Sequence, residues 1–473
     1  MDANNVLYPV HREIAADIET PVSAFLALKE EGKMGFLLES VEMGEKLGRY
    51  SFLGFDPELI FTAKKNTVRV TFNGETEEIE SADPIAEIKR IVSSFREEPV
   101  EGLPPFTAGL VGYFSYDSVR YFEKLPDIKP DKLGLPDIFL VLPRVLIAFD
   151  HIRQKLILIG HAYSPDKKDE VMQTLLEYET RLFSAKPPDR IKESSKNKID
   201  LISNFRKADF IQAVEKAKQH IVAGDIFQVV LSQRLRTTID IGPFDIYRKL
   251  RMINPSPYMF FIDLEDFQLV GSSPEVMVRR TKSGDKDELI VRPIAGTRPR
   301  GKNKKEDEAF EHDLLSDVKE LAEHTMLLDL ARNDVGRISE FNSVRVEAPY
   351  HIERYSHVMH IVSDVFGKPN PQYDAIDVIG ATFPAGTVSG SPKVRAMEII
   401  EDLEPEKRGV YAGAIGYIDF SGNTDTCIAI RTIVHKDGTA YLQAGAGIVY
   451  DSVPEREYEE TINKAKALMK AII

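Results

Sequence analysis

Two pairs of glutamates have the residue type and spacing of a divalent-cation site. Glu320 and Glu323 stand three residues apart in one predicted helix. Glu457 and Glu460 do so in another. Side chains at positions i and i+3 share one face of a helix, and carboxylate oxygens are ligands that Mg²⁺ prefers. Two such pairs facing each other would bind Mg²⁺, although each pair by itself is also typical of a solvated helix face.

The apolar stripe of each helix predicts how its glutamates are oriented. The first helix carries its stripe at Leu314, Val318, Leu321 and Thr325. The second carries its stripe at Thr461, Ala465, Leu468 and Ile472. Glu457 lies beside the second stripe, so we expect it to point partly inward. Glu320 and Glu323 lie away from the first stripe, so this pattern alone places both on the solvent face.

Small residues dominate the segment Gln443–Ile448 (QAGAGI), which lies between a predicted strand and a predicted helix that begins at Pro454. Small residues let backbone N–H groups approach an anion, and a nearby helix terminus adds a favourable dipole. The segment matches neither the phosphate-binding pattern GxxxxGK[ST] nor the dinucleotide pattern GxGxxG. We expect a turn here, which either binds an anion or has no ligand.

Two further segments place hydroxyl groups and small residues on predicted loops, where functional sites concentrate. They are Pro293–Arg298 (PIAGTR) and Thr382–Lys393 (TFPAGTVSGSPK). A predicted strand holds His357 and His360, whose spacing directs them to opposite faces. At most one of them can therefore face a given site, and a single histidine more often has a structural role.

Predicted strands and helices are mixed without strict alternation, which favours an α+β class with large antiparallel or mixed sheets. Strands expected in the second half of the chain are Asp225–Arg234, Cys427–Val434 and Tyr441–Gln443. The segment Ser184–Asn204 is rich in Pro, Ser and Lys and has the composition of a linker. We therefore divide the chain into an N-terminal half, residues 1–190, and a C-terminal half, residues 200–473.

A weak internal repeat links these halves. The segment Leu53–Glu58 (LGFDPE) resembles Val270–Glu275 (VGSSPE). In the same order, Ala108–Tyr113 (AGLVGY) resembles Ala412–Tyr417 (AGAIGY). Matches this short also arise by chance. If they reflect a duplication, the two halves have related folds whose sheets pack together.

The composition excludes several classes of protein. The 473 residues carry a formal net charge of −14, which argues against nucleic-acid binding. No apolar run approaches about 18 residues, so we expect no membrane span, and the N-terminus lacks a signal-peptide pattern. The single cysteine, Cys427, excludes a disulfide framework and lies in a predicted strand rather than at a nucleophile turn. These features predict a cytoplasmic protein.

Ten segments together resemble, in order, the chorismate-utilising enzyme family, and within it the large subunits (component I) of anthranilate synthases. They span residues 36–58, 225–234, 254–261, 272–275, 293–301, 319–334, 355–365, 381–400, 408–432 and 443–465. The resemblance implies an anthranilate-synthase-like α+β fold. In that fold two large β-sheets face each other and helices pack outside them, as an α/β/β/α sandwich.

The resemblance also implies roles for individual residues. Glu275 matches a general acid that protonates the departing ring hydroxyl, and His360 matches a histidine linked to pyruvate elimination. The residues that match substrate-binding positions are Gly296, Thr297, Thr387, Tyr411, Arg431, Gly445, Ala446 and Gly447. The residues that match the Mg²⁺ site, directly or through water, are Glu320, Glu323, Glu457 and Glu460. This assignment replaces the solvent-face interpretation of the first glutamate pair.

By resemblance, the reaction is the Mg²⁺-dependent conversion of chorismate and ammonia to anthranilate and pyruvate, the first step of tryptophan biosynthesis. Aminodeoxychorismate synthases commonly carry a nucleophilic lysine where this chain has Ala295. Salicylate and isochorismate synthases carry a lysine base where it has Gln228. Aminodeoxychorismate synthase component I and a non-catalytic tryptophan-binding module stay open as alternatives, as do 2-amino-2-deoxyisochorismate synthases, which stop before elimination.

The resemblance further implies feedback inhibition by L-tryptophan. The matching positions are Glu39, Ser40, Asn254, Pro255, Pro257, Tyr258 and Met259, with Gly422 and Cys427 near them. We hypothesise that tryptophan lies across the strands around residues 36–40 and 258–262, and that the N-terminal half is a duplicated core that became regulatory. The alternative is that Leu37–Ser40 is only a core strand and turn. Ammonia would come from a separate glutamine amidotransferase subunit (component II), in a heterodimer or heterotetramer.

Overall fold

The computed structural model describes residues 5–40, 48–186, 189–192, 194, 200–284, 286–355 and 358–473. The strands of the N-terminal half are β1 (Asn5–Ala15), β2 (Gly35–Glu39), β3 (Tyr50–Lys64), β4 (Thr67–Phe72), β5 (Glu75–Glu80), β6 (Phe95–Glu97), β7 (Gly109–Phe114), β8 (Ile138–Asp150) and β9 (Lys155–Ala162). The strands of the C-terminal half are β10 (Ile202–Ser203), β11 (Gln228–Thr238), β12 (Tyr258–Asp263), β13 (Phe267–Ser273), β14 (Val276–Ser283), β15 (Lys286–Val291), β16 (Ile294–Pro299), β17 (Arg345–Arg354), β18 (Val358–Gly367), β19 (Gly390–Ser391), β20 (Ala414–Asp419), β21 (Thr424–Ile428), β22 (Thr432–Lys436) and β23 (Thr439–Ile448).

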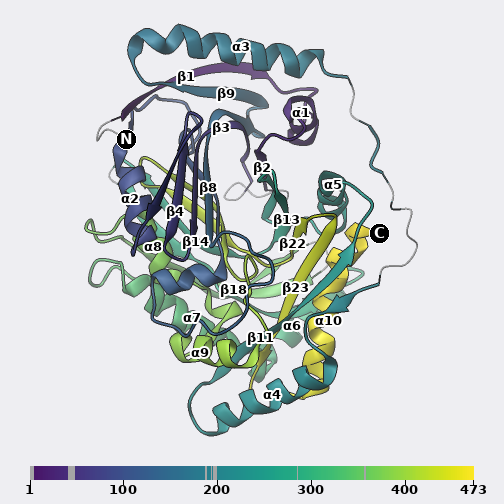
Figure 1. Cartoon of the computed structure of the whole chain (residues 1–473). Coiled ribbons are helices and arrows are strands. Elements are labelled where there is room, and N and C mark those ends of the chain that lie inside the picture. The colour runs from purple at the N-terminus through teal and green to yellow at the C-terminus, as the bar shows by residue number, and fades with distance from the viewer. Residues whose placement is uncertain are drawn as a thin grey trace.

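Helices lie around the outside of these strands. They are α1 (Pro21–Leu28), α2 (Pro84–Ser94), α3 (Lys168–Ser184), α4 (Lys207–Val222), α5 (Pro243–Ile253), α6 (Lys304–Ser316), α7 (Val318–Gly336), α8 (Ala375–Thr382), α9 (Lys393–Leu403) and α10 (Pro454–Ile472). Figure 1 shows α3 covering β1 and β9, and α10 lying along β23. Among the described residues, no helix combines the length and apolar character needed to cross a membrane.

Strand pairing arranges the strands in two facing layers. One layer runs in the order β1, β9, β8, β3, β2, β12, β13, β22, β23, β11. The other runs β5, β4, β3, β8, β7, β20, β21, β14, β15, β18. The long strands β3 and β8 belong to both layers, because a register shift between Pro57 and Leu59 turns them from one layer into the other.

Three large apolar clusters fill the space between layers. One lies between the two sheets and includes Phe36, Phe52, Val111, Phe260 and Ile415. The second packs the first sheet against α1, α3, α5 and α10. The third packs the second sheet and β11 against α2, α4, α8 and α9. The predicted α/β/β/α arrangement is confirmed.

The predicted strand Cys427–Val434 is wrong as a single element. The chain leaves β21 after Ile428 and enters β22 at Thr432, and the two strands have different partners. Arg431 lies in the break with φ of 49°, in the left-handed region that a Cβ atom disfavours. The sequence pattern predicted one strand because both strands are buried and their apolar residues read as one continuous run.

Two predicted loops are strands instead of loops. The segment Gln443–Ile448 continues β23 rather than forming a turn, and most of Pro293–Arg298 forms β16, which pairs with β18. The segment Thr382–Lys393 is mostly irregular, as predicted, with a short 3₁₀ turn at Gly386–Val388. The predicted linker lies partly outside the described residues, and its end forms β10, which pairs with β11.

Strand pairing also brings equivalent segments of the internal repeat together. Strand β2 pairs with β12, and β7 pairs with β20 so that Gly112 lies opposite Gly416. A Cβ on either of these glycines would lie 2.0 Å from a backbone oxygen of a neighbouring strand. Gly54 and Gly271 each lie against a phenylalanine ring, which an added Cβ would approach to 2.2 and 2.0 Å. These matched close approaches support related folds for the two halves.

Candidate active site

Glu320 and Glu323 lie on the buried face of α7, where the apolar stripe did not place them. Asp317 ends α6 and caps α7 by accepting hydrogen bonds from the backbone N–H groups of Lys319 and Glu320. The buried face of α7 is therefore not a continuation of the buried face of α6. Val318, part of the predicted stripe, is 79% exposed. The residues that α7 buries are His324, Leu327, Leu328, Ala331, Asp334 and Val335. The two glutamates lie one turn before them on the same face.

The second glutamate pair lies on α10. The apolar stripe of this helix correctly predicted its buried face, since Thr461, Ala465, Leu468 and Ile472 are all buried. Burial raises the pKa of Glu457, and the charges of Glu460 and Glu323 raise it further. Burial also raises the pKa of Glu323, and the charges of Glu320 and Glu460 add to that shift. The carboxylates of the two helices therefore act on one another at short range.

Two cations lie within this cluster. Arg298 donates a hydrogen bond to Glu320 at 3.0 Å, and Lys464 pairs with Glu460 at 2.7 Å. In the described part of the chain, no three His, Cys, Asp or Glu side chains form a ready-made metal site. The donor set still suits Mg²⁺, because this ion keeps several waters and needs only one or two protein carboxylates. A bound cation would also relieve the repulsion that raises the pKa of the glutamates.

His360 on β18 lies beside the backbone of β16. Its Nδ1 donates to the Gly296 carbonyl at 2.8 Å and lies 3.1 Å from the Thr297 hydroxyl. The bond to a carbonyl makes Nε2 the unprotonated nitrogen of the neutral ring, and burial lowers the pKa of His360. Gly296 has φ of 68°, and a Cβ there would lie 3.1 Å from Glu320 Oε2. The same backbone therefore borders both the histidine and the glutamate cluster.

Glu275 lies between β13 and β14 and is 7% exposed. Burial raises the pKa of Glu275 to about 8, and the nearby Thr387 hydroxyl and Arg431 guanidinium oppose this only in part. A carboxyl group with this pKa carries its proton at neutral pH. It can therefore act as a general acid.

Tyr411 and the glycines of β23 form another wall of the site. A Cβ on Gly445 would lie 2.8 Å from the Tyr411 hydroxyl, and a Cβ on Gly447 would lie 2.4 Å from Gln228 Nε2. Strand β22 pairs with β23 only as far as Leu442. Beyond it, no described strand pairs with the edge of β23 that faces away from β11. Backbone N–H groups on this edge can bind an anion.

Shared charged neighbours indicate that these groups lie near one another. Arg431 acts on both Glu275 and His360. Lys464 acts on both Glu275 and Glu323. Because such interactions weaken with distance and are screened by solvent, the acid, the histidine and the glutamate cluster lie close together.

Sequence reasoning missed the two cations of this site. Lys464 also donates to the Gly445 carbonyl at 3.0 Å, so it joins α10 to the glycine-rich part of β23. Its position four residues after Glu460 was an available signal, because such residues share a helix face. Arg298 ends a segment that was singled out for its small residues and hydroxyl groups, but the apolar stripe alone placed its partner Glu320 on the solvent face.

A buried amide also faces the glutamates. Gln228 is 3% exposed, and its Nε2 lies 3.3 Å from Glu323 Oε1. Its Oε1 is buried and has no hydrogen-bond partner in the part of the chain that the structure describes. His357, the other histidine of its predicted strand, lies outside the described residues.

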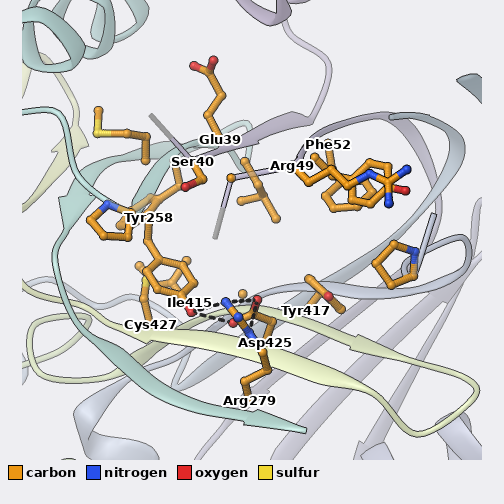
Figure 2. A pocket seen from close by; sticks show the side chains of 18 of the residues that line it. Glu39, Ser40, Arg49, Phe52, Tyr258, Arg279, Ile415, Tyr417, Asp425 and Cys427 are labelled. Carbon is orange, nitrogen blue, oxygen red and sulfur yellow. Dashed lines mark hydrogen bonds and ion pairs between the residues drawn. The ribbon is translucent and has the colours of Figure 1, made fainter. Parts of the chain in front are cut away.

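A second candidate site is a cavity of about 310 Å³ that lies between the two sheets (Figure 2). Phe52 and Tyr417 contribute aromatic surface to its lining. Asp425 accepts hydrogen bonds from Tyr258 at 2.7 Å and from Arg279 at 2.8 Å, and Figure 2 shows this group on one side of the cavity. The cavity is thus partly aromatic and partly charged, and both halves of the chain contribute to it.

Most of the predicted tryptophan positions line this cavity. Those in the lining are Glu39, Ser40, Pro257, Tyr258, Met259 and Cys427. Those outside it are Asn254, Pro255 and Gly422. The Glu39 side chain points away from the cavity (Figure 2), and its carboxylate accepts hydrogen bonds from Tyr247 and Arg251. Glu39 therefore contributes mainly its backbone to the lining.

The chain is similar to known proteins along its whole length. The family model for chorismate binding enzymes matches residues 36–470. Anthranilate synthase component 1 of Aquifex aeolicus is 48% identical, over 100% of this chain and 96% of that protein. The crystal structure of anthranilate synthase component I from Streptococcus pneumoniae has a TM-score of 0.80 at 38% identity, over 96% of this chain and 98% of that chain. The menaquinone-specific isochorismate synthase of Escherichia coli shares the fold, with a TM-score of 0.74 at 20% identity, over 100% of this chain and 96% of that chain. The chain therefore belongs to the chorismate binding enzyme family.

Proposed function

We propose that this chain is the large subunit of an anthranilate synthase, which converts chorismate and ammonia to anthranilate and pyruvate. The observation that carries the proposal is Glu275, a buried carboxyl group whose pKa is raised to about 8, set among cations and carboxylates of the same site. Hydroxide is a poor leaving group, so the ring hydroxyl of chorismate must be protonated as it departs. Glu275 supplies that proton.

The two carboxylates of chorismate call for two positive centres. Arg431, Tyr411 and the unpaired N–H edge of β23 bind the enolpyruvyl carboxylate, and the planar guanidinium suits a bidentate contact. Glu320, Glu323, Glu457 and Glu460 would hold a Mg²⁺ ion beside the position of the ring carboxylate. When bound, Mg²⁺ supplies the positive charge that neutralises this carboxylate.

His360 fits the second half of the reaction. Ammonia adds at ring carbon 2 as the carbon-4 hydroxyl leaves with the proton from Glu275. Loss of pyruvate then aromatises the ring, and carbon 2 must give up a proton in that step. His360 is held neutral by its lowered pKa and has an unprotonated Nε2, so it can accept this proton.

Two residues favour ammonia as the nucleophile. Ala295 on β16 has no group that could attack chorismate, unlike the lysine of aminodeoxychorismate synthases. Gln228 cannot deprotonate water, unlike the lysine of salicylate synthases. Its buried Oε1 has no partner among the described residues and can accept an N–H of ammonia.

Ammonia itself would come from a glutamine amidotransferase subunit in a heterodimer or heterotetramer in the cytoplasm. Cys427 is 1% exposed, and burial raises the pKa of its thiol. A buried, protonated thiol is a poor nucleophile, so Cys427 is unsuited to hydrolyse glutamine. The chain supplied with free ammonium should nevertheless form anthranilate without a partner.

The cavity between the sheets is the proposed site of feedback inhibition by L-tryptophan. Its volume falls at the small end of ordinary ligand pockets. Phe52 and Tyr417 suit an indole ring, whereas Arg49 and Asp425 offer charges for an amino acid. The Ser40 hydroxyl is buried without a hydrogen-bond partner in the described part of the chain. On this proposal the N-terminal half is a duplicated core that became regulatory.

Product analysis tests the proposal. The purified chain is incubated with chorismate, Mg²⁺ and ammonium, and the products are separated by chromatography with fluorescence detection. Anthranilate, formed by the unsubstituted chain but not by Glu275→Gln, is the expected result. Formation of 4-amino-4-deoxychorismate would favour aminodeoxychorismate synthase, and tryptophan binding without any turnover would favour a regulatory module.

A further inference from the structure

A buried arginine joins three of the elements that border the active site. Arg408 is 2% exposed. It donates hydrogen bonds to the carbonyls of Val388 and Val230, each at 2.7 Å, and to both oxygens of Glu404. Its guanidinium also lies 5.6 Å from the centre of the Tyr411 ring. A single side chain therefore contacts the turn Gly386–Val388, which contains Thr387, as well as strand β11 and Tyr411.

The partner carboxylate extends this contact along β11. Glu404 is 3% exposed and accepts hydrogen bonds from the Ser232 backbone N–H at 2.8 Å and its hydroxyl at 2.9 Å. Strand β19 pairs with β11 only at Gln228 and Val229, and β10 pairs with it only from Leu235. Between these two paired stretches of β11, Arg408 donates to the Val230 carbonyl and Glu404 accepts from the Ser232 N–H. The pair thus satisfies backbone groups that a neighbouring strand would otherwise satisfy.

The backbone that this pair fixes lies directly across from the glycines of the site. Val230 pairs with Gly447, and Ser232 pairs with Gly445. A shift of β11 would therefore move the glycine-rich edge of β23. It would also move Gln228, two residues before Val230.

We propose that the Arg408–Glu404 pair is a positioning device for the substrate-carboxylate site. It fixes β11, the Thr387 turn and the Tyr411 ring relative to one another without touching substrate. This inference rests on the proposed function, which assigns Tyr411 and the glycines to chorismate. A buried ion pair is weak evidence of stabilisation, because desolvation offsets its attraction. Positioning explains the choice of arginine better than stability does. The planar guanidinium has several donors in fixed directions, whereas a lysine ammonium cannot reach all three acceptors in this geometry.

Arg408→Lys tests this proposal against a matched control. Arg234 is also buried, at 5% exposed, and donates to Glu406 and to the Lys407 carbonyl in the same segment. None of its hydrogen bonds in the described structure reaches Val388 or Val230. We expect Arg408→Lys to raise the KM and the Kd for chorismate at least tenfold, and Arg234→Lys to change either less than twofold. Both should lower the melting temperature by similar amounts.

A double variant separates positioning from folding. Arg408→Met with Glu404→Met removes both charges without leaving one unpaired, and such replacements are often tolerated. If this variant melts cooperatively yet binds chorismate as tightly as the unsubstituted chain, the proposal is wrong. An equal loss of affinity in Arg234→Lys and Arg408→Lys would also overturn it.

Chorismate affinity is measured by isothermal titration calorimetry, which does not depend on the product formed. If the unsubstituted chain bound chorismate but made another product, the proposed function would fail while the comparison of Kd values would still decide the role of Arg408. The two failures are therefore distinguishable.

Discussion

Tyr411 and Arg431 stand at the two ends of one β-hairpin. Tyr411 lies three residues before β20 begins at Ala414, and Arg431 lies three residues after β21 ends at Ile428. Both ends are held in left-handed backbone, at Ala412 with φ of 65° and at Arg431 itself with φ of 49°. The middle of the same hairpin lines the cavity between the sheets. A ligand that displaced the hairpin would therefore move both residues proposed to hold the enolpyruvyl carboxylate.

Ser40→Arg should preserve activity and abolish tryptophan inhibition. The arginine side chain would occupy part of the cavity, whereas the groups around Glu275 would be unaffected. The measurement is anthranilate formation against tryptophan concentration. Ser93→Arg on the exposed face of α2 is the control for the substitution itself and should retain inhibition. Unchanged sensitivity of Ser40→Arg would remove tryptophan from this cavity.

Glu275→Gln should lower kcat by roughly 10²–10⁴-fold, the range expected for loss of a general acid. The same variant should be more stable at neutral pH. A carboxyl pKa raised from 4.5 to about 8 means that the folded state binds a proton that the unfolded state releases in this range. Stability is therefore lost as pH rises from 4.5 towards 8, on the order of 3 kcal/mol by pH 7.

Thermal unfolding at pH 5 and pH 8 checks the stability of Glu275→Gln. Its advantage over the unsubstituted chain should be larger at pH 8 than at pH 5. An equal difference at the two pH values would mean that Glu275 does not hold its proton in the folded protein.

The pH profile of kcat/KM should be bell-shaped. Its alkaline limb should fall through about pH 8, as Glu275 loses the proton it donates. Its acidic limb should fall below pH 6.5, because the pKa of His360 is lowered by burial and the ring must be neutral to accept a proton. Thr387→Val removes a hydroxyl that lowers the pKa of Glu275, so it should move the alkaline limb upward. A limb that stayed in place or moved downward would assign it to another group.

Glu323→Gln and Glu457→Gln should each weaken Mg²⁺ binding at least tenfold. Their raised pKa values reflect burial and neighbouring carboxylates, so each substitution removes a charge from the cluster that a cation would neutralise. Glu459→Gln is the matched control on α10, since Glu459 pairs with Lys207 at 2.9 Å and is half exposed. Titration calorimetry with Mg²⁺ should leave this control unchanged. Equal losses in all three variants would indicate a general charge effect.

The apolar pattern of a single helix predicted side-chain burial correctly where that helix runs without interruption. Helix α10 is uninterrupted, so its stripe correctly placed Glu457 towards the interior. The stripe counted from Leu314 placed Glu320 and Glu323 on the wrong face, because it assumed one continuous helix. Helix α6 ends before Asp317 and α7 begins after it, so the buried positions of α7 do not follow from those of α6. Aspartate is strongly favoured at N-caps, so Asp317 was the available signal that a new helix begins there.

The active site was harder to derive from pattern than the fold. Arg431 stands in an apolar run that reads as one strand, and only tertiary pairing shows that the run changes partners there. The glycines of β23 do not form the predicted turn. Strand β11 continues to pair with them beyond the point where β22 stops pairing with β23. The proposed roles of Glu275 and His360 came from family resemblance, since no local spacing distinguishes a catalytic carboxyl or histidine from a structural one.

The pairing of β2 with β12 and of β7 with β20 has a consequence for synthesis of the chain. More than 200 residues separate each pair of partners. While the ribosome makes the C-terminal half, β2 and β7 are open sheet edges, and the residues that β2 presents, such as Phe36 and Leu37, are apolar. Open apolar edges can pair with other chains, and long-range pairing is slow to complete. We therefore expect the N-terminal half, made without the C-terminal half, to expose these edges and to aggregate rather than fold as an independent unit.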